Sequence, residues 1–517
     1  MMIVPKITMD TEDPNASSAQ HTISGGVEIA PPPVADSTLV QETFVVPVAQ
    51  PSDPSIPQSD PINPYVPSIQ IPVMPPPTPL KGGVHSKRLF FVGVIIAVFV
   101  LAFVIIKAFA SKTAESKEVT ITYWGLWEND ATFRALTADF EAKNPKIKVQ
   151  YIKQSPKQYR ERLQSAINRG EGPDGFRFHN TWVAMLRNQL ALVPPTIMTP
   201  AEFTSAFFPV FASDLVAGQS IFGLPLMIDG LGLYINEDLF ATAGVTPPTT
   251  WTDVINIVPK LTVKNGSTLV TSAIALGTAS NVEHFSDIVA LMFMQNGASL
   301  TKLSGKEAEE TLVFYKKFSD PNDPLYTWSD GIDMSVSAFA AGRVAMILAP
   351  SWRAHDVKAI NPNLRFKIVP VPQLPGNSVA WASYWVEGVS SKSKYQMQTW
   401  EFVKYLTSVE GATRLYTEGS KTRLFGEPFS RIELANTIAE DSFTGAYVKQ
   451  ATFARSFPLA SRTYDNGIND KLIKYLEDAV NSMATNAPSK VLETASLGFR
   501  QVLSTYGLIT AAAPTPK

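Results

Sequence analysis

The chain contains no cysteine among its 517 residues. This absence excludes disulfide bonds, thiolate metal sites, a cysteine nucleophile and a lipid anchor attached through cysteine. An excess of charge is also lacking, because 44 basic residues nearly balance 46 acidic ones and leave a formal net charge of −2. A nucleic-acid-binding domain shows a strongly basic face or stripe, so neither DNA nor RNA is an expected partner.

The short motifs of common enzyme classes are missing as well. The five histidines show no H-x-x-x-H spacing, and no P-loop, complete dinucleotide fingerprint or G-x-S-x-G elbow occurs. We therefore expect no metal site, no cofactor and no catalytic residue, and we expect that the chain is not an enzyme. Glu128 and Asp229 leave one alternative open, a glycoside hydrolase, which needs two carboxylates at a separation that the sequence does not give.

The N-terminal region is rich in proline and poor in apolar side chains. Residues 1–80 hold 17 of the 40 prolines. Such a segment buries too little apolar surface to offset its ordering entropy, so we expect residues 1–87 to form a disordered tail. A spacer is the preferred interpretation of this tail, and a ligand for a proline-recognition domain is the alternative.

One long hydrophobic run follows the proline-rich region. The 18 residues from Leu89 to Ile106 carry no polar side chain, and as a helix they would span ~27 Å, close to the thickness of a bilayer core. A cleaved signal peptide is the competing interpretation, but the run is too long and begins too far from the N-terminus. We predict a single, uncleaved transmembrane helix at residues 88–110. Basic residues flank both of its ends, so charge does not decide its orientation.

From about residue 118 the sequence has the pattern of a globular domain. The stretches Val119–Trp124 and Ile147–Ile152 alternate like strands, and between them Asn129 can cap a helix with an apolar stripe. A buried strand is predicted at Val344–Ala349, and mostly helix is predicted after about residue 396. Strands that alternate with helices predict an α/β architecture with parallel pairing. The length exceeds what one core holds, so we expect at least two lobes.

Aromatic and polar side chains gather just after the predicted strands. In open α/β sheets, ligands bind beyond the carboxyl ends of the strands. Aromatic faces can stack on the C–H face of a sugar, and carboxylates and amides hydrogen-bond its hydroxyl groups. The candidate ligand-binding residues are Trp127, Glu128, His179, Asn180, Asp229, Trp352 and Trp385.

Packing is the competing interpretation for several aromatic residues. Trp124 alternates within its strand and is assigned to the core, and Trp251 is assigned to packing at the start of a helix. At Asp229, in the stretch LPLMIDGLGLY, a hinge or turn role competes with ligand contact. Tyr384 and Trp385 either line the site or pack in the core.

Several stretches together carry a resemblance to a known family. They are ITYWGLWE, FRALTADFEAKNPKIKVQ, EGPDGFRFHNTWVAMLRNQLALVPPT, FGLPLMIDGLGLYINEDLFATAGVTPPTTWTDV, FAAGRVAMILAPSW, and VPQLPG through TWEFVKYLTSVEGATRLY. In this order and spacing, residues 118–500 resemble the extracellular solute-binding proteins of bacterial ABC importers. The resemblance is to the maltose-binding-type (family 1) proteins, which take up sugars and glycerol phosphates.

This resemblance implies a two-lobed periplasmic-binding-protein-like fold with a hinge of crossing strands. The bilobed domain would span residues 118–510, with lobe I at about 118–226 and again from about 373, and lobe II at about 227–372. The family's cleft-lining segments match Trp127, Glu128, His179, Asn180, Asp229 and Trp352 of this chain. Tyr384 and Trp385 depart from the family, which often has small residues in this strand.

The function implied is that of a membrane-anchored extracellular solute-binding protein. Its expected partners are a small-molecule ligand, a sugar or a related polar solute, and an ABC permease, with the membrane reached through residues 88–110. The protein would sit in the cell membrane with a cytoplasmic N-terminus and an extracellular C-terminal domain. The alternative is a sensor or scaffold of the same fold that signals through the transmembrane helix to the tail.

Overall fold

The computed structural model describes residue 100 and residues 117–510, all within one compact unit that spans residues 96–517. The predicted tail, and the predicted transmembrane segment apart from Val100, lie outside the described residues. Within the part described, no helix combines the length and the apolar character that crossing a membrane requires.

The first sheet is built from the start of the domain. Its core strands β1 (Val119–Gly125), β2 (Ile147–Lys153) and β3 (Gly175–His179) are parallel, as predicted, and β1 lies between the other two. The strand β14 (Trp385–Ser390) joins β3 in antiparallel register, although it follows more than 200 residues later in the chain. The short strands β4 (Leu190–Ala191) and β7 (Leu224–Pro225) also pair with β14.

The predicted helix after β1 is confirmed as α2 (Asp130–Lys143). The side chain of Asn129 caps it by accepting a hydrogen bond from the backbone N–H of Thr132 at 2.8 Å. The apolar stripe of α2 is buried against β1 and against α13 (Gln396–Leu406), where Phe133 and Phe140 contact Phe402 edge-on. This packing covers one face of the first sheet.

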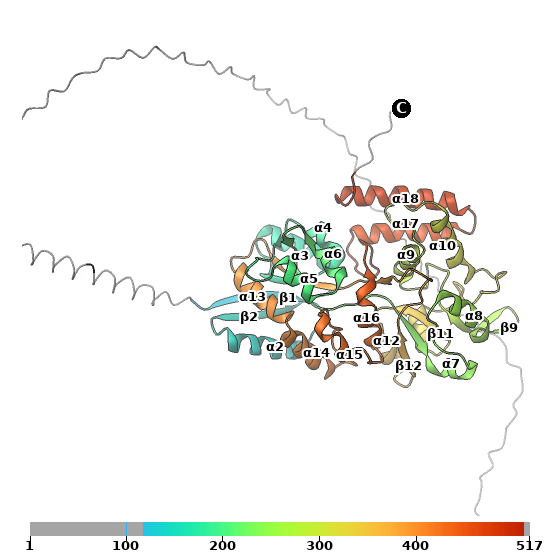
Figure 1. Ribbon diagram of the computed structural model, residues 1–517, viewed down its shortest axis with the longest axis horizontal. Coiled ribbons are helices and arrows are strands. Elements are labelled where there is room, and N and C mark those ends of the chain that lie inside the picture. The colour runs from blue at the N-terminus through green and yellow to red at the C-terminus, as the bar shows by residue number, and fades with distance from the viewer. Residues whose placement is uncertain (1–99, 101–116, 511–517) are drawn as a thin grey trace, which may run out of the picture. The chain divides into compact units, whose positions relative to one another are not determined.

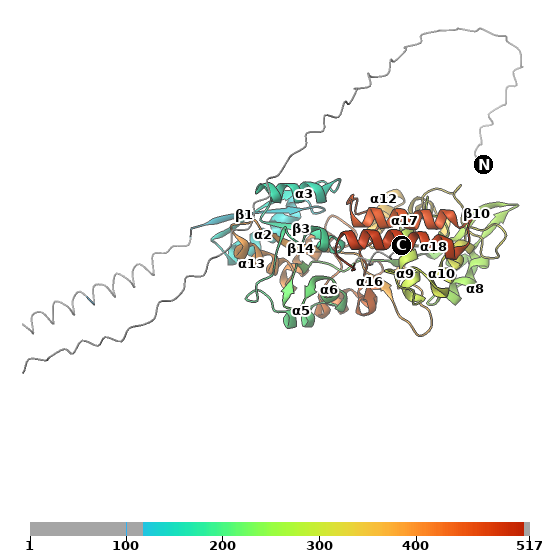
Figure 2. The ribbon, with the colours of Figure 1, turned by 90° about the horizontal axis from the view of Figure 1, so that it is seen from above.

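The second sheet comes from the middle of the chain. Its strands lie in the order β12 (Phe366–Val369), β8 (Gly232–Asn236), β11 (Val344–Ala349), β10 (Thr268–Ile274) and β9 (Val263–Asn265). All six residues of β11 are buried, which fits the apolar run predicted there. Figures 1 and 2 show the two sheets in separate halves of the domain, and Figure 1 shows α7 (Glu237–Ala243) and α8 (Trp251–Leu261) next to the second sheet.

The remaining elements are short strands and helices. The helices are α3 (Tyr159–Arg169), α4 (Val183–Leu186), α5 (Pro200–Ala206), α6 (Pro209–Leu215), α9 (Phe285–Gln295), α10 (Lys306–Lys317), α11 (Ser335–Ala340), α12 (Arg353–Ile360), α14 (Val409–Ser420), α15 (Ala435–Ile438), α16 (Gly445–Gln450), α17 (Ile468–Ser482) and α18 (Pro488–Thr505). Two small ladders pair β5 (Val216–Ala217) with β6 (Ser220–Ile221), and β13 (Ala380–Trp381) with β15 (Ala454–Arg455).

The C-terminal helices contact elements next to both sheets. Helices α17 and α18 pack on each other and against α9 and α10, which belong to the segment that forms the second sheet (Figure 1). Helix α17 also reaches the 3-10 turn Asn180–Trp182 that directly follows β3. The lobe boundaries expected from the sequence stay a prediction.

The chain crosses between the two sheets in segments that hydrogen-bond to one another. Residues 226–231 lead from β7 to β8, and residues 370–384 lead from β12 to β14. The N–H of Leu231 donates to Trp381 O at 3.2 Å, and the N–H of Ser383 donates to Asp229 O at 3.0 Å. Only glycine fits at position 230, because an added Cβ would lie 1.7 Å from Trp381 O. These crossing segments bring residues of both sheets to one place.

Candidate functional site

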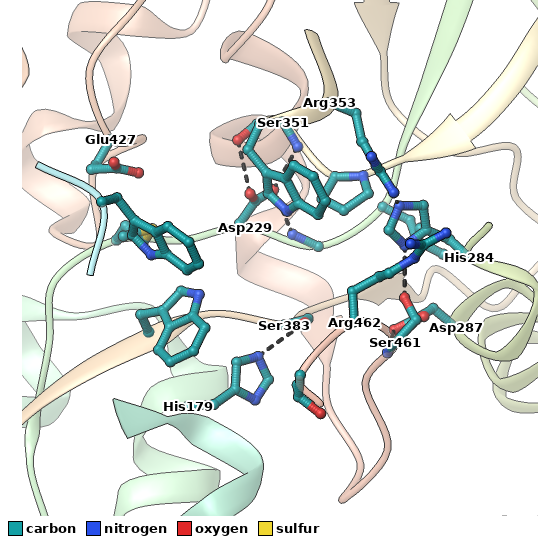
Figure 3. Close-up of a pocket in the computed structure, with 18 of the residues that line it drawn as sticks. His179, Asp229, His284, Asp287, Ser351, Arg353, Ser383, Glu427, Ser461 and Arg462 are labelled. Atoms are coloured by element: carbon teal, nitrogen blue, oxygen red, sulfur yellow. Dashed lines mark hydrogen bonds between the residues drawn. The ribbon is translucent and has the colours of Figure 1, made fainter. Parts of the chain in front are cut away.

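A cavity of about 360 Å³ lies where the crossing segments meet the ends of both sheets. Its wall comes from the loop after β1, the end of β3, the start of β14, the junction of β11 and α12, and the segments 423–427 and 461–464. Figure 3 shows that side chains from these separate parts of the chain point into one space. The wall therefore combines residues that lie far apart in the sequence.

Four tryptophans line the cavity, at positions 127, 352, 381 and 385. The rings of Trp127 and Trp385 meet edge to face with their centroids 5.7 Å apart, and Trp385 meets His179 in the same way at 5.1 Å. Trp127 is 38% exposed and Trp352 is 41% exposed, although both are large apolar side chains. Such accessible aromatic faces can stack on the apolar face of a ligand.

Asp229 is the carboxylate at the crossing of the segments. It accepts hydrogen bonds from the N–H of Gly230 at 2.8 Å, the N–H of Ser351 at 2.9 Å and the Ser351 hydroxyl at 2.8 Å. Burial raises the pKa of Asp229 to about 7, although these hydrogen bonds act to lower it, and the nearby charge of Glu427 raises it further. A carboxylate with this pKa can accept or donate a hydrogen bond near neutral pH.

His179 ends β3 and faces the cavity beside Trp385. Its Nδ1 lies 2.8 Å from the hydroxyl of Thr181. Its Nε2 lies 3.1 Å from the hydroxyl of Ser383 (Figure 3). Burial lowers the pKa of His179 to about 3, so the imidazole is neutral at physiological pH. It contributes a polar, uncharged surface to the wall.

A second polar group surrounds the start of α9. Asp287 accepts hydrogen bonds from the indole N–H of Trp381 at 2.9 Å and from the N–H of Ser461 at 3.1 Å. Burial raises the pKa of Asp287 to about 6. Nδ1 of His284 lies 2.7 Å from the hydroxyl oxygen of Ser461. Nε2 of His284 accepts a hydrogen bond from Nε of Arg353 at 3.1 Å. These contacts tie the segment 461–464 to α9.

Five of the seven predicted site residues line the cavity. They are Trp127, His179, Asp229, Trp352 and Trp385. The other two, Glu128 and Asn180, are buried outside its wall. Asn180 donates to the carboxylate of Asp214 at 3.0 Å and accepts from the N–H of Tyr384 at 3.3 Å, so its amide is occupied within the fold.

Glu128 points into the first sheet because it pairs with a buried cation. Both of its carboxylate oxygens accept from Nη1 of Arg177, at 2.7 and 2.9 Å, and Arg177 also binds Glu387 at 2.8 Å. Burial alone would raise the pKa of Glu128, but the charge and hydrogen bonds of Arg177 outweigh it and lower that pKa. The hydroxyl of Tyr123 donates to the second oxygen of Glu387. Glu128 is therefore not positioned to form a glycosidase carboxylate pair with Asp229.

The structure distinguishes the aromatic residues that pack in the core from those that line the cavity. Trp251 is buried at the start of α8, where its indole N–H donates to Gln295 at 2.7 Å, as expected for a packing residue. Trp124 packs against the core. On β14, Trp385 lines the cavity while the preceding Tyr384 is fully buried and donates its hydroxyl to Asp214 at 2.6 Å. Tyr384 directly precedes β14 and Trp385 begins it, and the two neighbouring side chains lie in different environments.

Other lining residues were not predicted from the sequence. Arg353 directly follows Trp352, so extending the strand-end rule by one residue would have included it. The segments that carry Arg423, Phe425 and Glu427, and Ser461 to Tyr464, follow no strand of either main sheet and carry no such signal. Within the described part of the chain, no group of three or more acidic, histidine or cysteine side chains is placed to hold a metal ion.

Comparisons with known proteins agree with this geometry. The family model described as bacterial extracellular solute-binding protein matches residues 124–413. A multiple sugar-binding protein of Streptococcus mutans is 23% identical over 354 residues, which are 66% of this chain and 83% of the relative.

Solved structures match over most of the described domain. An ABC transporter solute-binding protein from Thermotoga lettingae, bound with alpha-D-tagatose, aligns with a TM-score of 0.58 and 19% identity, covering 75% of this chain and 100% of its own. The sugar-binding protein MalE from Xanthomonas citri aligns with a TM-score of 0.60 and 18% identity, covering 75% of this chain and 98% of its own. At these identities the likeness establishes the fold, which is α/β with two domains.

Proposed function

Because the chain belongs to the family of bacterial extracellular solute-binding proteins, we propose that it binds a carbohydrate or related polar solute for ABC-type import. The observation that carries this proposal is a cavity lined by four tryptophans next to Asp229, Asp287 and neutral histidines. Flat apolar faces beside hydrogen-bonding groups suit a polyhydroxylated ligand. The family and its fold neighbours are binding proteins, in agreement with the expectation that the chain is not an enzyme.

Closure of the two domains, each built around one of the two sheets, would be coupled to ligand binding. Trp127 and Trp385 belong to the first sheet and its loops, whereas Trp352 follows β11 of the second sheet. A ligand that touches both groups gains its full set of contacts only when the groups approach each other. Binding therefore shifts the equilibrium toward the closed state by the difference in affinity between the states.

The test is a binding screen by calorimetry and tryptophan fluorescence, with the full-length chain and a panel of mono- and disaccharides. We expect at least one sugar to bind and to change the emission of the lining tryptophans. Binding of none of the sugars would contradict the carbohydrate proposal. A sugar whose affinity is unchanged by both Trp352→Ala and Trp385→Ala would place the binding site elsewhere.

The proposal includes anchoring by residues 88–110, with residues 1–87 in the cytoplasm and the solute-binding domain outside the cell. The apolar run supports the anchor, and a capture domain has access to external solute only on the outer face. Deleting residues 88–110 should move the protein from the membrane fraction to the soluble fraction. External protease should degrade the domain, but not the tail, in intact cells; protection of the domain would contradict the orientation.

A sensor is the second candidate function, favoured by the proline-rich tail that precedes the apolar run. Ligand-dependent closure would then be transmitted through the membrane helix to the tail. Adjacent genes for permease subunits favour transport, and adjacent kinase or cell-wall genes favour sensing. Deleting residues 1–80 should leave solute uptake intact for a transporter and should abolish the response to solute for a sensor.

A further inference from the structure

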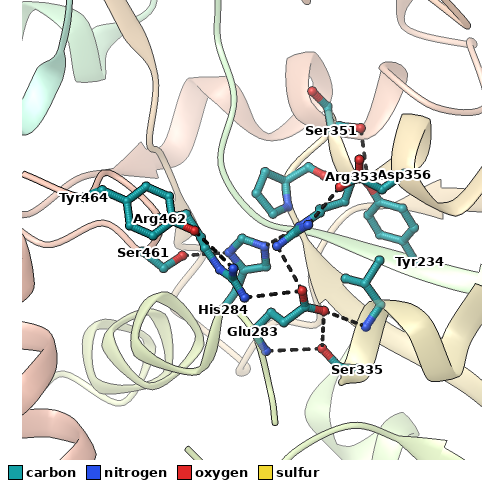
Figure 4. Close-up of polar contacts among 12 residues, drawn as sticks. Tyr234, Glu283, His284, Ser335, Ser351, Arg353, Asp356, Ser461, Arg462 and Tyr464 are labelled. Carbon is teal, nitrogen blue, oxygen red and sulfur yellow. Dashed lines mark hydrogen bonds and ion pairs between the residues drawn. The ribbon is translucent and has the colours of Figure 1, made fainter. Parts of the chain in front are cut away.

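The arginines on the cavity wall are already neutralised by acidic partners. Arg423 pairs with Glu427 at 2.9 Å. Arg353 pairs with Asp356 at 2.8 Å and with Glu283 at 3.0 Å. Arg462 reaches the carboxylate of Glu283 at 3.3 Å. Figure 4 shows both guanidinium groups directed at Glu283. An anionic ligand would have to compete with these carboxylates for the positive charges.

The histidines of the wall add no positive charge at neutral pH. Burial lowers the pKa of His179 to about 3 and that of His355 to about 4, and the charge of Arg423 adds to the effect at His355. The pKa of His284 is also held well below its usual range, first by burial and then by Arg353 and Arg462. All three imidazoles are therefore neutral under physiological conditions.

The carboxylates of Asp229 and Asp287 lack a cationic partner among the described residues. Their hydrogen-bond donors are neutral: backbone N–H groups, serine hydroxyls and the Trp381 indole. They are only 6% and 3% exposed, and both belong to the cavity wall. Burying a carboxylate without a counter-charge is costly. A ligand that brings a positive charge removes this cost.

Of the two, Asp229 has the more available oxygen. Its Oδ2 accepts one hydrogen bond, from the hydroxyl of Ser351, whereas both oxygens of Asp287 accept from the N–H of Ser461 and each has a further donor. A carboxylate oxygen has two lone-pair sites, so Asp229 Oδ2 keeps one for a ligand. The lining tryptophans also suit a cation, because the faces of indole rings attract positive charge.

We propose that the solute carries a protonated amine alongside its hydroxyl groups and that this ammonium is bound by Asp229. The inference rests on the proposed function and specifies its ligand as an amino sugar or a related cationic polyol. The ammonium would donate to Oδ2 of Asp229, and the hydroxyl groups would meet the neutral polar residues of the wall. A sugar phosphate or a uronate would face unpaired carboxylates instead, so the site disfavours it.

Isothermal calorimetry on the full-length chain at pH 7.5 tests this proposal with matched triplets: glucose, glucosamine and glucuronate, and the galactose equivalents. The amine of the better-binding triplet should bind about tenfold or more tightly than its neutral counterpart, since a hydrogen bond to a charged group is a strong one. The uronate should bind most weakly. Equal affinity for the amine and the neutral sugar would overturn the ammonium proposal and leave sugar binding standing. Failure of every member to bind would overturn the ammonium proposal for these sugars, whereas the carbohydrate proposal is contradicted only when the full panel of mono- and disaccharides also fails to bind.

The variant Asp229→Asn assigns the effect to this side chain. It should reduce the ratio of the affinity for the amine to the affinity for the neutral sugar to less than about threefold. The matched control is Asp238→Asn, which alters an exposed aspartate that pairs with Arg365 away from the cavity, and it should keep the wild-type preference. An unchanged preference in Asp229→Asn would overturn the assignment.

A second measurement needs no variant. At pH 6.5 part of the Asp229 population is protonated, because burial raises its pKa to about 7. Binding of an ammonium should expel this proton, and titrations in two buffers of different ionisation enthalpy count the protons released. The amine should release protons and the neutral sugar should not; equal counts for the two ligands would contradict the proposal.

Discussion

Glu128 and Arg177 form an ion pair in which each side chain is only 1% exposed, with 2.7 Å between Oε1 and Nη1. Glu387 completes the cluster from β14. Breaking a buried pair by removing one partner is costly, since the other charge stays buried. The pair therefore joins the loop after β1 to β3 and, through Glu387, to β14, which also carries Trp385 at the cavity.

Replacing Glu128 by alanine should destabilise the domain. Arg177 would keep Glu387 as a partner but would lose both hydrogen bonds from its Nη1 to a carboxylate. We expect the free energy of unfolding to fall by about 3 kcal/mol, measured by urea denaturation.

The control for this change is Glu410→Ala, which removes an exposed ion pair with Lys143. It should lower the free energy of unfolding by less than about 1 kcal/mol. A Glu128→Ala protein as stable as this control, yet unable to bind the solute, would show that Glu128 acts at the cavity and that its buried position is wrong.

Gly230→Ala tests the close approach of the crossing segments. The new Cβ would lie 1.7 Å from the carbonyl oxygen of Trp381, so one backbone must move. We expect a loss of about 3 kcal/mol or more in the free energy of unfolding, together with loss of solute binding. Gly331→Ala is the control, because its Cβ would meet only the Ser329 hydroxyl at 3.7 Å and should change stability by less than about 0.5 kcal/mol.

Much of the fold follows from local sequence patterns. The alternating stretches became β1 and β2, the apolar run 344–349 became β11, and Asn129 caps α2 as its position before the apolar stripe predicts. Each of these depends on periodicity or capping within a few residues. Five of the seven candidate site residues lie at the cavity, four of them beside strand ends that converge there and Asp229 in the crossing segment 226–231.

The misplaced candidates depend on partners far away in the chain. Glu128 follows Trp127 directly, and the sequence does not show which of the two side chains turns inward. The answer is set by Arg177, which lies 49 positions further on and needs a buried counter-charge. The segment 461–464 reaches the cavity through contacts with α9, so no local pattern marks it.

Trp352→Ala should weaken solute binding. The indole is 41% exposed on the cavity wall, and the guanidinium carbon of Arg353 lies 4.3 Å from the centroid of its ring. Removing this face deletes ligand contacts while leaving the core intact, so we expect about a tenfold rise in the Kd measured by calorimetry. Tyr395→Ala removes another exposed aromatic outside the cavity and should leave the Kd unchanged; a similar loss in both variants would show that the effect is not local.

Asp229 should make the stability of the domain fall as the pH rises. Its pKa is about 7 in the folded chain, because of burial, but about 4 in an unfolded chain. Between these values the folded state binds more protons than the unfolded state, so raising the pH favours unfolding. The loss of stability caused by ionising the buried Asp229 is absent below about pH 4, grows between pH 4 and pH 7, and is complete above about pH 7.

The difference in unfolding free energy between Asp229→Asn and the wild type isolates this contribution, because Asp287 and the other acids titrate in both proteins. From pH 5 to pH 8 the difference should shift in favour of the variant, by at most about 3 kcal/mol. Ser351→Ala removes a hydroxyl that lowers the pKa of Asp229 by hydrogen bonding, so it should extend the window to higher pH. A difference that does not change with pH would mean that the Asp229 carboxylate finds a counter-charge in the folded protein, and Asp229 would then not be the unpaired acid that the proposal requires for a cationic solute.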